Sequence, residues 1–302
     1  MELITLMDKF GSDEKCRTYL ENLRFPDGVK CLRCESDKIS RIYERNQFHC
    51  DNCKYQFSVT VDTIFHNSHL PLQKWFAAIY LMCESRKGIS ANQLKRTLNV
   101  AYKTAWYLCH RIRKAVEEGN DTLLTGIVEV DETFIGGLAK NMHKHKREAK
   151  IQGRGSVGKT AVMGLLERKG RVLAKVIERT DRETLHNEVK SNVETGANLF
   201  TDEWRLYRGL DEQYVHEVIN HGVEYVRGHI HTNGIENFWS LLKRTINGTY
   251  VSVEPFHLGR YLDEQMFRFN EQKVKDQDRF LGVLKAVSGK RLTYDELRDY
   301  GS

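Results

Sequence analysis

The 302-residue sequence lacks three features that would restrict its class: a membrane-length apolar run, a secretory leader and a disordered composition. No apolar stretch approaches the roughly 18 residues that a membrane helix needs. The acidic start Met1-Glu2-Leu3-Ile4 lacks the basic region of a signal peptide. With 40% hydrophobic and 29% charged residues, the composition is that of a folded protein. We therefore expect a cytoplasmic protein with room for two or three domains.

Cysteine usage points to a metal rather than to disulfides. The seven cysteines are an odd number, and four of them form two CxxC pairs with 15 residues between the pairs. This spacing is typical of a structural zinc ion held by four thiolates, here those of Cys31, Cys34, Cys50 and Cys53. Strand-like segments at 39–48 and 55–59 complete the outline of a zinc ribbon, which is too small to stay folded without its ion. The alternative is a small domain with four buried thiols.

The hydrophobic period becomes helical after the cysteine pairs. A short helix capped by Ser90, a break at Asn99-Val100 and a longer helix over 101–115 predict a helix-turn-helix, a motif that reads DNA with its second helix. The polar and basic residues of that second helix are the candidate DNA contacts: Tyr102, Lys103, Arg111, Arg113 and Lys114. An ordinary helical bundle with a solvated basic face is the alternative.

Positive charge is concentrated in one further segment. The net charge of +6 favours a polyanionic partner only weakly, but residues 140–159 hold seven Lys or Arg against one acid. We expect a basic insertion whose Lys144, Lys146 and Arg147 follow a DNA backbone; a solvated loop is the alternative. Residues 153–160 also match the phosphate-binding loop pattern. Because a strand rather than a helix is predicted to follow, we do not expect ATP binding there.

Three carboxylates stand in a pattern that suits metal chemistry. Residues 126–137 and 197–202 each predict a strand that delivers an aspartate at its end, Asp131 and Asp202. Glu236 lies 34 residues after Asp202 on a predicted helix. Two strand-end aspartates and a helical glutamate are what a divalent-metal phosphoryl-transfer site needs. The order of strands and helices predicts a mixed α/β layer with helices available for both faces.

Several neighbours compete with these three carboxylates. Glu129 shares the strand face of Asp131 and is the strongest rival, whereas Glu132 and Glu203 are expected to point away because strand side chains alternate. His229 and His231 precede the glutamate helix and are either structural or in contact with DNA or the metal shell.

Asp131, Asp202 and Glu236, followed by Lys243 two helical turns on, resemble the DDE triad of RNase H-like transposases and integrases. The resemblance extends over nearly the whole chain. The cysteine pairs, the strand 130–133 with its Gly136-Gly137 turn and the segment 231–244 resemble bacterial insertion-sequence DDE transposases with an N-terminal zinc ribbon.

The resemblance implies an α/β protein with an RNase H-like mixed sheet flanked by helices, preceded by a zinc ribbon and a helix-turn-helix-like segment. We expect an N-terminal helix (1–24), the ribbon (25–60), the helical segment (61–121), a catalytic domain (122–275) with the basic insertion 138–160, and a small C-terminal helical piece (276–302).

The implied function is transposition. The protein would bind the terminal inverted repeats and the target DNA of a mobile element and would act as a homo-oligomer on paired ends, associated with the nucleoid. Two Mg²⁺ ions, or Mn²⁺, would be held by Asp131, Asp202 and Glu236, and Lys243 and Arg244 would contact phosphates. A zinc-ribbon regulator without catalysis and a structure-specific RNase H-like nuclease are the alternatives.

Overall fold

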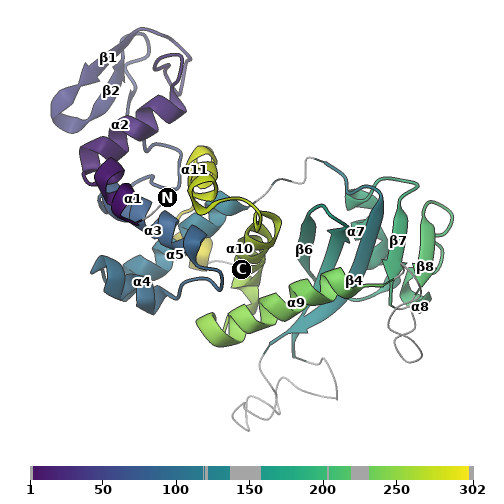
Figure 1. Ribbon diagram of the computed structural model, residues 1–302. Coiled ribbons are helices and arrows are strands. Elements are labelled where there is room, and N and C mark those ends of the chain that lie inside the picture. Colours follow the sequence, from purple (N-terminus) through teal and green to yellow (C-terminus); the bar gives the residue numbers. More distant parts are fainter. Residues whose placement is uncertain are drawn as a thin grey trace. The chain divides into compact units, whose positions relative to one another are not determined.

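The computed structural model describes residues 3–117, 119, 122–136, 158–202, 204–218 and 231–298 (Figure 1). The chain forms two compact units. The first, which we call the ribbon unit, comprises Met1–Val116 and Val274–Ser302, and the second, the sheet unit, comprises Glu117–Lys273. In the parts of the chain that the structure describes, no helix is both long and apolar enough to cross a membrane.

The ribbon unit begins with two helices, α1 (Leu3–Phe10) and α2 (Asp13–Arg24), where the sequence predicted one. Ser12 separates them, because its backbone is extended and its side chain accepts the N–H of Lys15, which caps α2. A small antiparallel sheet follows, formed by β1 (Ile39–Ile42), β2 (Gln47–Cys50) and β3 (Gln56–Phe57), with the short helix η1 (Tyr43–Arg45) in its first turn.

The helical part of this unit contains α3 (Leu72–Glu84), α4 (Ala91–Leu98) and α5 (Tyr102–Val116). The chain returns to it with α11 (Asp276–Lys285) and α12 (Asp295–Arg298). Fully buried Phe280 of α11 lies 5.8 Å from the ring of Phe10 and 6.0 Å from that of Phe76. The C-terminal segment therefore completes the core of the N-terminal helices.

The sheet unit is built on five strands, β4 (Ile127–Ile135), β5 (Thr160–Glu167), β6 (Val172–Ile177), β7 (Asn198–Thr201) and β8 (Val215–Val218). Their order is β6-β5-β4-β7-β8. β5 is antiparallel to both β4 and β6, whereas β4, β7 and β8 are parallel. The mixed RNase H-like sheet predicted from the sequence is confirmed.

Helices cover both faces of this sheet (Figure 1). α7 (Arg182–Asn192) and α8 (Trp204–Tyr207) lie on the face to which β4 contributes Val128 and Val130. α9 (Asn233–Thr245) and α10 (Leu258–Asn270) cover the face to which β4 contributes Ile135. The π-helix η3 (Ile246–Tyr250) and the short η4 (Pro255–His257) connect them. Strand alternation thus gives the odd-numbered residues of β4 to the α9 face.

Candidate functional site

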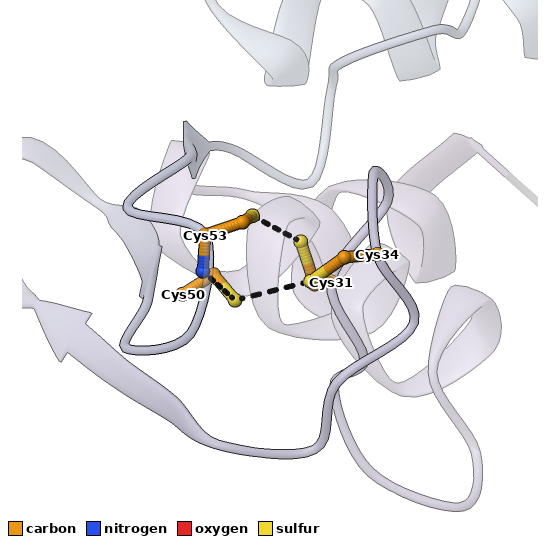
Figure 2. Close-up of side chains that lie close together, drawn as sticks. All are labelled: Cys31, Cys34, Cys50 and Cys53. Carbon is orange, nitrogen blue, oxygen red and sulfur yellow. Dashed lines mark hydrogen bonds between the residues drawn. The ribbon is translucent and has the colours of Figure 1, made fainter.

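Two chemical sites emerge from these elements, and the first is the cysteine cluster of the ribbon unit. The four sulfur atoms of Cys31, Cys34, Cys50 and Cys53 lie within 4.8 Å of one another (Figure 2). The Cys31–Cys53 and Cys34–Cys50 sulfur distances are 3.5 and 3.6 Å. A tetrahedral zinc site with Zn–S bonds of about 2.3 Å has S–S edges of about 3.8 Å. The four thiols therefore fit one zinc ion.

Two matching backbone turns produce this convergence. In each turn the residue after the second cysteine, Glu35 or Lys54, has a left-handed backbone. Its N–H donates to the carbonyl of the first cysteine, over 3.0 Å for Glu35 to Cys31 and 2.9 Å for Lys54 to Cys50. The turns leave N–H groups that face sulfur, such as that of Arg33, 3.4 Å from the Cys31 Sγ.

Donors of this kind favour the metal-binding form of one of the thiols, that of Cys34. The backbone N–H of Ser36 and the side-chain amide of Asn52 lower the pKa of the Cys34 thiol to about 6. Since zinc binds thiolates, a thiol that ionises easily is a better ligand. The four-cysteine cluster is consistent with structural zinc and with the ribbon predicted from the CxxC spacing.

The second site lies on the α9 face of the sheet unit. Val130 of β4 pairs in register with Thr201 of β7, and the two strands are parallel. Asp131 directly follows Val130 and Asp202 directly follows Thr201, so the register brings the two aspartates side by side. Asp202 directly follows β7, as expected, but Asp131 does not end its strand, because β4 continues to Ile135 in pairing with β5. The expectation of two strand-end aspartates was wrong for Asp131.

Helix α9 brings the third carboxylate to these two. Glu236 lies in the first turn of α9, and its Oε1 accepts the hydroxyl of Thr232 over 3.1 Å. One turn later, Trp239 donates its Nε1–H to Asp131 Oδ2 over 2.9 Å. This contact needs a glycine opposite Asp131: a Cβ at Gly164 would lie 2.5 Å from the Trp239 ring. The helix can therefore approach β4 closely.

The pKa of Asp131 depends on its burial and on the charges of its neighbours. Burial, helped by the charges of Asp202 and Glu236, raises the pKa of Asp131 from 3.8 to about 7, and the hydrogen bond from Trp239 opposes the rise. Carboxylates that interact in this way repel one another, and a bound cation relieves the repulsion. The three carboxylates are not packed as tightly as the thiols, because among the described residues only the four cysteines gather possible ligand atoms within 4.8 Å.

One face of α9 continues from the carboxylates to two basic side chains. Ile235, Phe238, Trp239 and Leu242 are buried in the core. Glu236, Lys243 and Arg244 are exposed. Lys243 lies two turns after Glu236, so the two share the exposed face, as the sequence predicted.

The neighbouring acids and histidines differ from the three carboxylates in what they contact. Glu129 is buried and forms an ion pair with Arg168, 2.7 Å from its Nε, and the ring of His231 lies beside this pair. Glu132 accepts the hydroxyl of Tyr207, on the face opposite to Asp131. Glu203 and His229 lie outside the described residues.

Sequence reasoning missed Trp239 and Arg168. Trp239 was detectable from its position three residues after Glu236 on a helix. Nothing in the sequence links Arg168 to Glu129, because the two meet only through strand pairing.

The candidate DNA contacts of the ribbon unit need one correction. α4 and α5 are separated by a three-residue turn with left-handed Asn99, as a helix-turn-helix requires. Tyr102 and Lys103 are exposed, and Lys114 is half-buried. Arg111 and Arg113 are only 3% and 1% exposed.

Arg111 instead donates to the carbonyl of His66 over 2.6 Å and lies against the ring of Trp75. Burial therefore removes Arg111 and Arg113 from the candidate DNA contacts. Lys144, Lys146 and Arg147 lie outside the described residues. Thr160 of the phosphate-loop match begins strand β5 rather than a helix, as predicted.

Comparisons with known proteins match two parts of the chain to transposase families. Residues 123–270 match the ISXO2-like transposase domain, and residues 11–56 match the transposase zinc-ribbon domain. The chain is 27% identical over 251 residues to an uncharacterized protein in the transposable element ISH50 of Halobacterium salinarum, covering 79% of this chain and 84% of that protein. This relative is archaeal, so the bacterial origin expected from the sequence stays a prediction.

Proposed function

Because the chain belongs to the ISXO2-like DDE transposases, we propose that it binds the terminal inverted repeats of a mobile element and cleaves and joins DNA through Asp131, Asp202 and Glu236. The observation that carries this proposal is the parallel register of β4 and β7, which sets Asp131 beside Asp202 under the helix that bears Glu236. Metal-dependent phosphoryl transfer needs such a set of carboxylate ligands.

Each residue of the proposed site has its own role. Asp131 and Asp202 would hold divalent ions jointly, Glu236 would complete the second ion's ligands, and Trp239 would fix the orientation of the Asp131 carboxylate. Two bound Mg²⁺ or Mn²⁺ ions would activate a water or a 3′-hydroxyl and stabilise the leaving oxygen. Lys243 and Arg244, exposed on the same helix, would contact the phosphates of the strand that enters the site.

DNA ends would be recognised by the ribbon unit. The exposed start of α5, with Tyr102 and Lys103, offers the part of a recognition helix that commonly contacts bases. The four-cysteine ribbon would hold its fold through zinc. Since transposition pairs two ends, we propose that the protein works on DNA as a homo-oligomer.

The two alternative functions considered from the sequence, a regulator and a structure-specific nuclease, can be distinguished from a transposase. A regulator without catalysis would gain stability by losing a repulsive carboxylate cluster, and the raised pKa of Asp131 argues that the cluster is retained for chemistry. A structure-specific nuclease would cleave branched DNA without preference for an end sequence. The ribbon and the helix-turn-helix favour recognition of a defined end.

The test is a strand-cleavage and strand-transfer assay in Mg²⁺ on DNA that carries the inverted repeats flanking the gene. Asp131→Asn, Asp202→Asn and Glu236→Gln should each lower the rate on the order of a thousandfold or more, since each removes a metal ligand, while binding of the repeats persists. Glu132→Gln, on the same strand but directed at Tyr207, is the matched control and should stay near the wild-type rate. Wild-type activity on branched DNA alone, or full activity of Asp131→Asn, would contradict the proposal.

A further inference from the structure

Glu129 is a charged side chain in an unusual place. It lies on β4 two residues before Asp131, on the same strand face, and is 1% exposed. Its strand neighbours in register are Leu166 of β5 and Phe200 of β7, both buried. A buried carboxylate is strongly destabilising unless it is paired and hydrogen-bonded.

The beginning of helix α9 supplies one of its partners. The first N–H groups of a helix have no partner within the helix, and a capping side chain usually satisfies one of them. The N-cap residue Thr232 makes no such bond with its side chain. Instead the backbone N–H of Ile235 donates to Glu129 Oε2 over 3.0 Å. A carboxylate at this position also suits the positive end of the helix dipole.

Arg168, the residue after β5, supplies the other partner. Its Nε donates to Glu129 Oε1 over 2.7 Å, and its terminal NH2 donates to the carbonyl of His231 over 2.6 Å. The His231 Nδ1 lies 2.9 Å from the same nitrogen. The guanidinium rests on the ring of Phe200, 4.7 Å from its centroid. One arginine thus joins three strands of the sheet to the segment that leads into α9.

We propose that Glu129 and Arg168 form a clamp that positions the start of α9, and with it Glu236, over the two aspartates. The consequence for catalysis, the positioning of Glu236, rests on the proposed function. The contacts of Glu129 and Arg168 do not depend on that function. Glu129 acts through α9 and is a positioning residue. The clamp gives it no role as a metal ligand, since one carboxylate oxygen already accepts from Arg168 and the other from the Ile235 N–H.

The close fit around Gly234 supports a defined position. A Cβ added at Gly234 would lie 2.7 Å from Glu129 Oε2 and 2.5 Å from the Leu166 side chain. The first turn of α9 therefore approaches the carboxylate as closely as a glycine allows. Glu236 lies in this same turn, and Trp239 follows one turn later at fixed helical spacing.

Hydrogen exchange in the metal-free full-length protein tests the clamp directly. Glu129→Gln keeps the size of the side chain but removes its charge, and Arg168→Gln removes the other half of the ion pair. Since a charge-assisted hydrogen bond is lost in each, amides at the start of α9 should exchange faster by about tenfold or more. Arg168→Lys, which keeps the charge without the forked geometry, should fall between Arg168→Gln and the wild type.

Mn²⁺ binding, followed by electron paramagnetic resonance without DNA, gives the second readout. Both clamp variants should need several-fold more Mn²⁺ for half-saturation, because Glu236 is held less firmly. Glu132→Gln serves again as the matched control, since it makes the same chemical change on the other face of β4, and should alter neither readout.

The outcomes separate the clamp from the proposed function. Unchanged exchange at the start of α9 in both clamp variants would overturn the clamp, even if Asp131→Asn abolishes strand transfer. Loss of Mn²⁺ binding in Glu129→Gln with unchanged exchange would overturn it too, because Glu129 would then be a ligand. Faster exchange with no strand transfer by the wild-type protein would refute the function and leave the clamp in place.

Discussion

Asp131→Asn is expected to stabilise the metal-free protein at alkaline pH, although the same change should abolish its activity. The carboxyl of Asp131 is half-buried beside Asp202 and Glu236, and its pKa in the folded protein is about 7 rather than 3.8. Asparagine has nearly the same shape, and its amide oxygen can still accept the Trp239 N–H, although the Glu132 N–H, which donates to the other oxygen over 2.8 Å, loses its acceptor. The substitution therefore removes repulsion without removing much packing.

The sign of the effect follows from proton linkage. Between pH 3.8 and about 7 the unfolded chain has released the Asp131 proton while the folded protein retains it. The free energy of unfolding of the wild type must then fall as the pH rises through this window. Each pH unit within this window lowers the free energy of unfolding by about 1.4 kcal/mol. The wild type should lose about 3 kcal/mol from this group between pH 5 and pH 8, of which the asparagine variant loses none.

The measurement is urea unfolding of the full chain at pH 5 and pH 8, without added magnesium or manganese. Exchange protection of the β4 and β7 amides reports the sheet unit separately from the ribbon unit. The quantity to compare is the stability difference between variant and wild type, since any packing defect of asparagine cancels between the two pH values. A difference that is equal at both pH values would refute the assignment of a raised pKa to Asp131. A larger advantage for the variant at pH 5 would refute the sign.

Two further results are expected in the ribbon unit. Cys50→Ser should lower the zinc content well below one ion per chain and unfold the ribbon while β4 and β7 stay protected; an unchanged zinc content, measured by atomic absorption, would contradict the four-thiolate site. Lys103→Gln should weaken DNA binding and reduce the magnitude of its salt slope by about one. Arg111→Gln should leave that slope unchanged but destabilise the unit by about 1–3 kcal/mol, because the buried His66 contact is lost. A lower slope for Arg111→Gln, in filter-binding titrations, would show that it contacts DNA.

The parts of the fold that could be predicted from the sequence are those with a local signal. Paired cysteines at a fixed spacing imply a zinc ribbon whatever surrounds them, and the turns at Glu35 and Lys54 are part of that local geometry. Likewise, the β-branched run around Asp131 and the capped run after Ser90 specify a strand and a helix by their own composition.

What could not be predicted depends on partners distant in the chain. Arg111 and Arg113 follow the pattern of an exposed basic helix face, yet both are buried, and the C-terminal segment contacts the same helix where Tyr107 donates its hydroxyl to the carbonyl of Leu292. Where a strand ends is also not a local property: β4 continues past Asp131 because β5 pairs with it as far as Thr160. The Glu129–Arg168 pair depends on the same register.

The two faces of β4 explain how a destabilising carboxylate cluster can persist in a stable sheet. Val128 and Val130 point to the α7 core, where they contribute ordinary hydrophobic burial. Glu129 and Asp131 point to α9, and each contacts that helix directly, through the Ile235 N–H and the Trp239 indole. The helix is anchored in turn by Ile235, Phe238 and Leu242 in the core. Apolar packing of α9 thus holds Glu236 near Asp131 against their repulsion, so any change that loosens this packing should separate the carboxylates before it unfolds the sheet.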